Sequence, residues 1–572
     1  MHSSIRPHQF VAVQLPSEQT RLVKLVPNTY AGKHPFKLSN VLTPDSSIVN
    51  LGKYGSFSAN QVIGRPFYLT FEILDTPESD GYGLRVVSAT ELHAETLIEE
   101  AEADGEGDDA ETGDGTPLRT NREIVDDAST QRLTLEEIEE LKKEASGAGK
   151  DIVAKLLESH SALDQKTAFS LAKYTLRKRK KYIRRFTILP LDVNLLVNYS
   201  LQERDAGRTM ELRDEHIGLL GCLANVHHGG QVTTDALPDV KSNGRYLVVD
   251  ETGGLIVAAM AERMGILYPR DEEDLESEEQ LLTNEVKEQT KDAAGVGSKP
   301  YRRVRPRPMS AAGNTITVVH AYSQPNLSLL KYFGYDTNNP DESHPLHTNL
   351  KTISWLQLVN PENDPILSAE LPIMPAQELA ELKPSKRTAY FFKRNRYERV
   401  KNVVKEAREG GFDGLVVATL LTPASVFKHL VPRLAGSAPV AMYSPTVEPL
   451  VELMDLYSTG RRTAFITKKR ELSQNSPDDE EVDLSSLYDE FELDPTLLLA
   501  PTLHHSRVRA WQVLPGRTHP LMTGRGGAEG YLFHGVRVIP TTDHIQAAGT
   551  FRKRRKVAIS TPTTDQDVEM AT

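Results

Sequence analysis

The stretch "GRYLVVDETGGLIVAAMAERMG", residues Gly244–Gly265, is the strongest fold signal in this chain. A β-branched run ends at Asp250, a short turn contains Gly253 and Gly254, and an alanine-rich run typical of a helix follows. Strand, glycine-containing turn and helix, in this order, form the cofactor loop that opens a doubly wound α/β domain. This turn is short and poor in glycine, so the pattern alone does not decide whether the turn holds a cofactor.

The chain beyond Asp214 alternates between apolar strand patterns and helical patterns. "ERVKNVVKEAREG" and "VEPLVELMDLY" have helical spacing, and six runs are predicted strands: "RYLVVD", "TITVVHA", "SWLQLVN", "DGLVVATLL", "PVAMYS" and "TAFITKK". Continuous apolar strands between helices predict a mainly parallel sheet that is covered on both faces. Pro and Gly punctuation from Arg507 to Pro540 predicts an antiparallel end to this sheet.

The first part of the chain has a different pattern. Residues from Phe10 to about Leu74 alternate apolar and polar positions in short runs, which predicts a small antiparallel sheet or barrel. Thr134 and Glu137 form a predicted capping box, and helical patterns continue through "IVAKLLESH" and "QKTAFSLAKYTLRKRKKYIRRF". The run "TILPLDVNLLVNY" is predicted to return the chain to a sheet.

The net charge of −12 hides an uneven distribution of charge along the 572 residues. Glu99–Asp114, Asp271–Glu288 and Asp478–Asp494 together hold 27 acidic residues and one lysine, and they are predicted to be disordered. The remaining 52 acidic and 66 basic residues give the folded body a charge of +14, which favours a polyanionic partner.

The bulk composition also excludes several classes of protein. The single cysteine, Cys222, cannot form an internal disulfide and is expected to be a small buried residue. We find no apolar run long enough to span a membrane and no signal-peptide pattern at the N-terminus, so we expect a soluble intracellular protein. "HHGG" (His227–Gly230) and "LHH" (Leu503–His505) lack further ligands, so no metal site is expected.

A Rossmann-like methyltransferase holds S-adenosylmethionine with three features that can be checked in a sequence. They are a glycine-rich loop after the first strand, an acid at the end of the second strand, and an acid or Asn at the end of the fourth. Here the second strand ends at His320–Tyr322 and the fourth at Ala418–Leu420, with no acid. We therefore predict no cofactor and no catalytic residue, and a degenerate loop formed by Asp250, Glu251, Thr252, Gly253 and Gly254.

The run "KYTLRKRKKYIRRF" carries eight basic residues and no acid between Lys173 and Arg185. If this run is helical, the i, i+4, i+7, i+8, i+11 spacing puts Lys173, Arg177, Lys180, Lys181 and Arg184 on one face. A basic stripe suits phosphate contacts that position RNA without reading its sequence. The candidate RNA-binding residues are Lys173, Arg177, Lys178, Arg179, Lys180, Lys181, Arg184 and Arg185. A solvated helix face or a nuclear-localisation signal is the alternative.

Two other basic runs have open interpretations. In "KRTAYFFKRNRYERVK" (Lys386–Lys401), Lys386 and Arg387 are RNA-binding candidates and the aromatic residues could stack on unpaired bases. A helix that docks these aromatics in the core is an equal alternative. "FRKRRK" (Phe551–Lys556) is typical of a nuclear-import signal, which predicts a nuclear protein, and a tail that contacts RNA is the alternative.

Several motifs together resemble one protein family, the non-catalytic subunit of the eukaryotic tRNA (adenine-58, N1) methyltransferase. The motifs are "NREIVDD" (Asn121–Asp127), "KYTLRKRKKY" (Lys173–Tyr182), "ETGGLIVAAMAERMG" (Glu251–Gly265), "DGLVVATLLTP" (Asp413–Pro423), "QVLPGRTHP" (Gln512–Pro520) and "GGAEGYLFHG" (Gly526–Gly535). The resemblance implies an N-terminal β-barrel and a methyltransferase-like domain without a working cofactor site. It also implies a two-plus-two heterotetramer with a catalytic homologue, which binds the S-adenosylmethionine, and a shared grip on tRNA.

The expected fold class is therefore α/β plus β: a small N-terminal β-barrel with a helical linker, and a Rossmann-like methyltransferase fold with a degenerate cofactor site. Residues 1–90 are expected to form part of the barrel, 91–120 an acidic disordered insertion, and 121–205 the helical and basic segment that completes the N-terminal domain. Residues 206–545 are expected to form the methyltransferase-like domain, with disordered acidic insertions at about 268–300 and 472–495. Residues 546–572 are expected to be a disordered basic and polar tail.

The expected function is that of a non-catalytic, tRNA-binding subunit. It would support a catalytic homologous subunit that forms N1-methyladenine at position 58 in the T-loop of tRNAs. One alternative is an active S-adenosylmethionine-dependent RNA methyltransferase with an unusual loop. The other is an RNA-binding scaffold that works without a methyltransferase partner.

Overall fold

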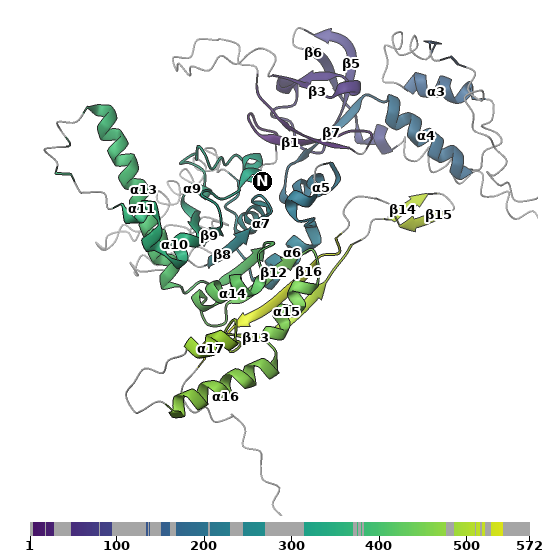
Figure 1. The fold of residues 1–572 in the computed structure, drawn as a ribbon. Helices are drawn as coiled ribbons and strands as arrows, with labels where there is room; N and C mark the ends of the chain where they lie inside the picture. The colour runs from purple at the N-terminus through teal and green to yellow at the C-terminus, as the bar shows by residue number, and fades with distance from the viewer. Residues whose placement is uncertain are drawn as a thin grey trace, which may run out of the picture.

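Two β-sheets organise the chain in the computed structural model (Figure 1). The smaller sheet is built from the first strands of the chain, and the larger sheet from strands beyond residue 243. The structure describes residues 4–17, 19–27, 47–78, 81–93, 133–134, 136–137, 150–160, 168–203, 206–228, 244–268, 314–369, 374–375, 379, 383–475, 485–508, 511–514, 517–520 and 528–540.

The larger sheet has seven strands in the order β10-β9-β8-β11-β12-β16-β13. The first five in this order are parallel: β10 (Leu350–Ser354), β9 (Asn314–His320), β8 (Gly244–Asp250), β11 (Gly414–Ala418) and β12 (Pro439–Ser444). β16 (Tyr531–Arg537) is antiparallel to both β12 and β13 (Leu498–His505). The chain order reverses between β8 and β11, which makes this a doubly wound, Rossmann-like sheet with an antiparallel end, as predicted.

Helices cover both faces of this sheet, which explains the continuous apolar strands. All seven residues of β8 are buried, and its side chains alternate between two cores. Tyr246 and Val248 pack under α5 (Val193–Glu203), α6 (Asp214–Leu223) and α7 (Leu255–Met264). Leu247 and Val249 pack under α13 (Pro384–Glu409), α14 (Pro423–Leu430) and α15 (Glu448–Leu456). Alternate positions of a strand point to opposite faces, so both must be apolar here.

The smaller sheet is antiparallel, with five strands in the order β2-β1-β7-β5-β6. These strands are β1 (Phe10–Gln14), β2 (Thr20–Lys24), β5 (Thr70–Glu78), β6 (Gly81–Val86) and β7 (Arg185–Pro190). β7 lies between β1 and β5 although about a hundred residues separate it from β6 in sequence. A separate pair, β3 (Ile48–Asn50) and β4 (Ser56–Ser58), packs on β7 because the Phe57 and Phe186 rings stack at 4.5 Å.

The described pairings support an antiparallel N-terminal sheet, but they do not close it into the expected barrel. Within the described residues, the pairing runs from β2 at one edge to β6 at the other, and no ladder joins these two edges. β4 lies against β6, so the β3–β4 pair covers part of the sheet. The N-terminal sheet contacts the larger domain where the Phe10 ring meets the edge of the Tyr332 ring at 5.1 Å.

Three predicted strands end earlier than expected or are helical. "SWLQLVN" is wrong as a strand, because β10 ends at Ser354 and α10 (Trp355–Val359) follows, started by a capping box between Ser354 and Gln357. "TILPLDVNLLVNY" is a strand only to Pro190, since the Asp192 carboxylate accepts from the Leu195 amide at 2.7 Å and starts α5. "TAFITKK" lies inside the helix α16 (Thr459–Asn475).

The expected disorder at 472–495 is wrong for the residues that the structure describes there. Residues 472–475 complete α16, and α17 (Ser485–Glu490) lies within the acidic run Asp478–Asp494. Leu487 and Phe491 are buried against Phe465 of α16, and the Phe465 and Phe491 rings meet edge to face at 5.2 Å. Apolar residues between the acids therefore hold this segment on α16. The insertions expected at 91–120 and 268–300, and the tail at 546–572, lie almost wholly outside the described residues.

Phe465→Ala should release α17 while leaving the two sheets folded. Removing a buried Phe ring costs about 3 kcal/mol at the lower end of the usual range, so amide exchange in α17 should become roughly a hundredfold faster. Hydrogen exchange measured by mass spectrometry on residues 485–491 checks this. Lys469→Ala, an exposed change on the same helix, is the control. Unchanged exchange in the Phe465 variant would show that this cluster does not hold α17.

Candidate functional site

Asp250 ends the central strand β8 and holds the loop that follows it. Its side chain is buried, and Oδ1 accepts hydrogen bonds from the Thr252 amide at 2.7 Å and the Thr252 hydroxyl at 2.6 Å. Oδ2 accepts from the Val257 amide of α7 at 3.0 Å. Burial raises the pKa of Asp250, and hydrogen bonds from Thr252 and Val257 partly offset that shift. The first turn of α7 is thus bonded to a carboxylate of the chain itself.

Glu251 joins the ends of β8 and β11 at the point where the strand order reverses. Its amide donates to the Ala418 carbonyl at 2.9 Å. Its Oε2 accepts from the Thr419 hydroxyl at 2.7 Å and from the Leu420 amide at 2.8 Å. Open α/β sheets bind their ligands in the crevice at this reversal. Here a side chain of the loop crosses it.

The two glycines of the loop let another segment pack directly on it. Gly253 and Gly254 have φ angles of 79° and 94°, which favour glycine. The Leu329 amide donates to the Gly253 carbonyl at 3.0 Å, and a Cβ on Gly254 would lie 3.0 Å from the Leu327 Cα. The glycines therefore allow close approach of the chain around η9 (Ser328–Phe333). The five predicted loop residues do lie together, but the contacts described above are all with other residues of this chain.

The space left at these strand ends is small. A cavity of about 80 Å³ is lined by residues from the ends of β8 and β9, by Trp355 and by Leu421. Pockets for drug-sized ligands usually enclose about 300–1,000 Å³. β9 ends at His320, whose pKa is lowered by burial and whose Nδ1 lies 2.8 Å from the Tyr322 carbonyl oxygen. No carboxylate follows β9 to accept from the ribose hydroxyls, and the Glu251 side chain crosses the crevice. The described residues therefore do not fit S-adenosylmethionine.

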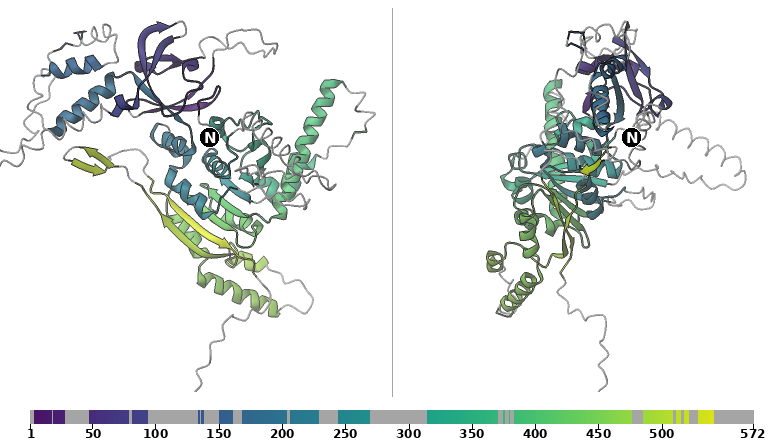
Figure 2. Two further views of the ribbon diagram at one scale, coloured as in Figure 1. Left: turned by 180° about the vertical axis from the view of Figure 1, so that it is seen from behind. Right: turned by 90° about the vertical axis from the view of Figure 1, so that its right-hand side faces the viewer.

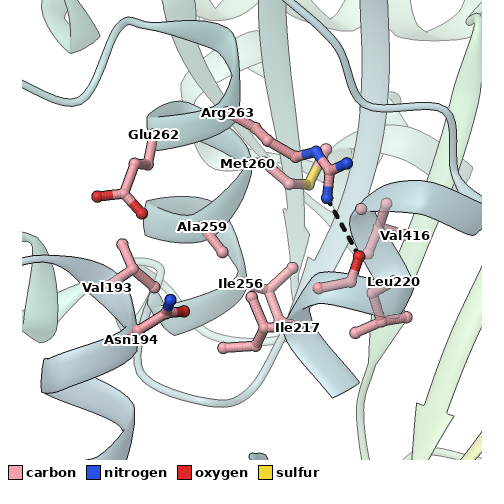
Figure 3. A pocket seen from close by; sticks show the side chains of 12 residues that line it. Val193, Asn194, Ile217, Leu220, Ile256, Ala259, Met260, Glu262, Arg263 and Val416 are labelled. Carbon is pink, nitrogen blue, oxygen red and sulfur yellow. Dashed lines mark hydrogen bonds between the residues drawn. The ribbon is translucent and has the colours of Figure 1, made fainter. Parts of the chain in front are cut away.

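A larger cavity of about 260 Å³ lies away from these strand ends, between α5, α6 and α7 (Figure 3). Its lining is mostly apolar, and Arg263 spans it to donate to the Gly218 carbonyl at 3.1 Å. The Arg263 guanidinium also contacts the Cys222 Sγ at 3.3 Å. Cys222 is exposed, so its expected burial is wrong. Glu262, whose pKa is raised by burial, accepts from the Tyr268 hydroxyl at 2.5 Å.

The basic run forms a helix beside the N-terminal sheet, as predicted. α4 (Ala168–Tyr182) packs against α3 (Lys150–Glu158), where the His160 and Tyr174 rings meet edge to face at 4.9 Å. Arg177 and Lys181 are exposed one turn apart on this helix. Lys178 and Arg179 are half-buried, and the Lys178 ammonium lies 4.8 Å from the centre of the Tyr174 ring. Lys173 and Lys180 also lie on α4, but their side chains are outside the described part.

The last two arginines of the run are not on the helix. α4 ends at Tyr182, so the predicted single face does not extend to Arg184, whose carbonyl accepts from the Ile73 amide at 3.0 Å. Arg185 begins β7, and its side chain is only 7% exposed. Its guanidinium lies 2.9 Å from Glu91 and 3.5 Å from the buried Glu72. Arg185 is thus held in an internal ion pair, and we leave it out of the proposed RNA contacts.

Lys386 and Arg387 lie on a different part of the molecule, near the start of α13. Both are exposed. Figures 1 and 2 place α13 and α4 far apart, with α13 standing out from the larger domain. Phe391 and Phe392 on α13 are 45% and 72% exposed, so the alternative in which these two rings dock in the core is wrong. The basic residues therefore fall on two separate surfaces.

Neither a metal centre nor a membrane span is found in the described part of the chain. Among these residues, no three His, Cys, Asp or Glu side chains gather as a metal site would require. His227 of the "HHGG" run places Nδ1 2.7 Å from the Asn225 carbonyl oxygen. No described helix is both long enough and apolar enough to cross a bilayer. "FRKRRK" lies outside the described residues.

Asp250 and Glu251 should respond differently to removal of their charge. Both oxygens of Asp250 accept from donors, so Asp250→Asn turns an NH₂ group toward a donor and should cost about 1–3 kcal/mol of stability. Only Oε2 of Glu251 has described partners, so Glu251→Gln can keep both bonds and should be nearly neutral. Calorimetric unfolding of the two variants tests this. Equal stability of both would contradict the role given to Asp250.

Comparison with solved structures finds low similarity over most of the chain. A SAM-dependent O-methyltransferase from Thermotoga maritima matches with a TM-score of 0.34 and 9% identity, over 95% of this chain and 97% of that one. The tRNA (m1A58) methyltransferase TrmI from Aquifex aeolicus also matches with a TM-score of 0.34 and 9% identity. That match covers 94% of this chain and all of TrmI.

Curated relatives match much more closely in sequence. The chain is 60% identical to the "tRNA (adenine(58)-N(1))-methyltransferase non-catalytic subunit trm6" of Aspergillus fumigatus, over 98% of this chain and 96% of the relative. It is 30% identical to the protein of the same name from Schizosaccharomyces pombe, over 97% and 96%. The model of the Gcd10p family matches residues 33–383. The chain therefore belongs to the Gcd10p family, together with these relatives.

Proposed function

We propose that this protein is the non-catalytic, tRNA-binding subunit of the methyltransferase that forms N1-methyladenine at position 58 of tRNAs. The name of the 60%-identical relative supports the non-catalytic role and the methylated position. The proposal depends on the position of Glu251. Its carboxylate accepts hydrogen bonds from Thr419 and Leu420 and so bridges β8 and β11, at the place where a doubly wound sheet would bind its ligand. In such a domain a side chain of the protein crosses the crevice where the cofactor would bind. The domain is therefore suited to a supporting role beside a catalytic subunit and not to catalysis.

The partner of this chain is proposed to be a catalytic homologous subunit that holds the S-adenosylmethionine. We propose a two-plus-two heterotetramer and no cofactor in this chain. The contacts of Asp250 support the second point, because they occupy the loop amide of Thr252 and the Val257 amide in the first turn of α7. We further propose that β3 and β4 complete a small N-terminal barrel, and that "FRKRRK" (Phe551–Lys556) directs the protein to the nucleus.

Contact with tRNA is assigned first to α4. Arg177 and Lys181 are exposed one turn apart, and the helix packs on α3 where Tyr174 meets His160. A rigid helix with cations on its outer side can position phosphates without reading bases. Lys173, Lys178, Arg179, Lys180 and Arg184 extend this basic surface in sequence, and Lys386 and Arg387 belong to a second surface on α13.

Two alternatives predict different behaviour. An active methyltransferase would bind S-adenosylmethionine and methylate RNA as an isolated chain. A scaffold that works alone would bind RNA but would not purify from cells with a methyltransferase homologue in equal amounts. Purification of the tagged chain, followed by a methylation assay with and without the co-purified partner, separates the three functions.

Arg177→Ala with Lys181→Ala should weaken tRNA binding through the loss of phosphate contacts. Each lost contact lowers the slope of log K against log salt by about 0.7 on single-stranded regions and about 0.9 on duplex. The double variant should therefore lose about 1.4–1.8 from the slope. In the reconstituted complex KM for tRNA should rise and kcat should stay nearly constant, as expected for lost binding.

The matched control is Lys469→Ala with Arg470→Ala, two exposed cations on α16. This variant removes the same charge far from α4, so its salt slope should equal that of the parent protein. Filter binding at several salt concentrations gives both slopes. If the α4 variant keeps the parental affinity and slope, α4 is a solvated helix face or an import signal and makes no tRNA contact.

A further inference from the structure

The first half of α13 extends beyond the body of the protein. The helix has 26 residues and is therefore about 39 Å long. Its buried residues, Val403, Val404 and Ala407, all lie in the last two to three turns, and Arg399 donates to the His347 carbonyl at 2.9 Å. Between Pro384 and Arg396 the described side chains are exposed or half-buried. Figures 1 and 2 show this half projecting into solvent.

The projecting half is strongly basic. It carries five positive charges, and the N-cap Lys383 adds a sixth, while α13 contains no acid before Glu398. The five are Lys386, Arg387, Lys393, Arg394 and Arg396. Lys383 and Arg387 are one turn apart, a spacing at which like charges destabilise a helix. A short helical segment without tertiary packing is also marginally stable. A bound polyanion would remove the repulsion, so the charge pattern favours a nucleic acid over a neutral or basic partner.

Two aromatic rings are exposed among these cations. Phe392 is 72% exposed and Phe391 is 45% exposed. Tyr390 differs from them, because its hydroxyl accepts from the Met374 amide at 3.0 Å and lies 3.2 Å from Arg394 Nη1. Tyr390 therefore ties the projecting half to residue 374, and its ring meets the Phe391 ring edge to face at 5.6 Å, while Phe392 stays mostly open to solvent. The exposed apolar area of these two rings gains no burial free energy in water, so we expect a partner surface to cover it.

The spacing puts a cation within one helical turn of each ring. Arg387 lies four residues before Phe391, and Arg396 lies four residues after Phe392, so each pair shares a face of the helix. One turn is about 5.4 Å. A nucleotide whose base stacks on a ring can therefore place its phosphate beside the neighbouring guanidinium. This combination of stacking ring and nearby cation is how proteins hold single strands without sequence preference.

We propose that the projecting half of α13, Pro384–Arg396, binds unpaired nucleotides of RNA, with Phe391 and Phe392 stacking on bases and Arg387 and Arg396 holding phosphates. The inference rests on the proposed tRNA-binding function and adds a second contact of a different kind. Base faces are hidden inside a duplex, so exposed rings are useful only at loops, bulges and ends. α4 grips phosphates, whereas this segment selects regions of the RNA that are not paired.

The test compares side chains of similar polarity with and without an aromatic ring. Phe391→Leu with Phe392→Leu keeps an apolar, helix-forming surface and removes both rings, while Phe391→Trp with Phe392→Trp keeps them. The full chain in complex with its catalytic partner is titrated with a labelled oligouridine and with an RNA duplex of equal length. The Leu variant should bind the oligouridine at least about fivefold more weakly for each ring lost. The Trp variant should bind at least as tightly as the parent.

Three controls make the result specific. Affinity for the duplex and the salt slope should not change in the Leu variant, because no cation is removed. Arg387→Gln with Arg396→Gln should instead lower the salt slope on oligouridine by about 0.7 for each contact. Val451→Ala, which trims an exposed apolar residue on α15, should change nothing.

Parental affinity of the Leu variant for oligouridine would overturn the inference, as would an equal loss on oligouridine and duplex. Loss of a co-purifying protein, with RNA binding intact, would also overturn it and would identify α13 as a protein-docking helix. If the α13 variants bind RNA normally and the α4 variant binds tRNA weakly, this inference fails and the proposed function stands. If the α4 and α13 variants all bind tRNA normally, the proposed function fails as well.

Discussion

The hydrogen bonds to the buried carboxylate of Asp250 hold the central strand, loop and helix of the larger domain together. This carboxylate lies at the carboxyl end of the central strand and accepts hydrogen bonds from the loop at Thr252 and from the first turn of α7 at Val257. A negative group at a helix N-terminus is stabilising, because it complements the unpaired amides and the helix dipole. The strand, loop and helix are thus held in their usual relative positions. The Thr252 and Val257 amides, which could otherwise face a ligand, are used within the chain.

The same arrangement explains how a methyltransferase-like sheet can stay folded in a subunit that is not catalytic. Glu251 crosses the crevice beside Asp250 and the segment around Leu327 packs on Gly254, which leaves a cavity of only about 80 Å³ at the place where an enzyme stays open. The RNA contacts proposed for this chain lie on surfaces that the core does not need. α4 packs on α3 through Tyr174 and leads directly into β7 of the N-terminal sheet, and α13 leaves the body at Arg399. Both surfaces are basic, and they lie far apart (Figures 1 and 2).

Much of this arrangement could be predicted from the sequence, because buried strands and capping residues have local patterns. The run ending at Asp250, the capping box of Thr134 with Glu137 and the basic helix were all correctly identified. Short apolar runs were ambiguous: "TAFITKK" is apolar enough for a strand but lies within a helix whose Phe465 is buried against α17. Periodicity alone cannot separate the two cases at this length.

Other features depend on contacts between distant residues and had no local signal. The pairing of Arg185 with Glu72 and Glu91 needs β7 to lie beside β5, which follows from topology and not from the basic run. The bonds from Thr419 and Leu420 to Glu251 likewise join segments that are far apart in sequence. The missing acids at the strand ends pointed to a site without cofactor. They did not reveal which side chains occupy it.

The crevice of this chain is narrowed by its own side chains, and a partner is proposed to hold the cofactor. Isothermal titration calorimetry with S-adenosylmethionine tests this proposal directly, using the purified chain, the assembled complex, and a complex whose catalytic subunit has been disabled for cofactor binding. We expect no binding to the chain alone, one site for each catalytic subunit in the complex, and none when that subunit is disabled. Micromolar binding to the isolated chain, or a second site in the complex that survives the disabled partner, would contradict it.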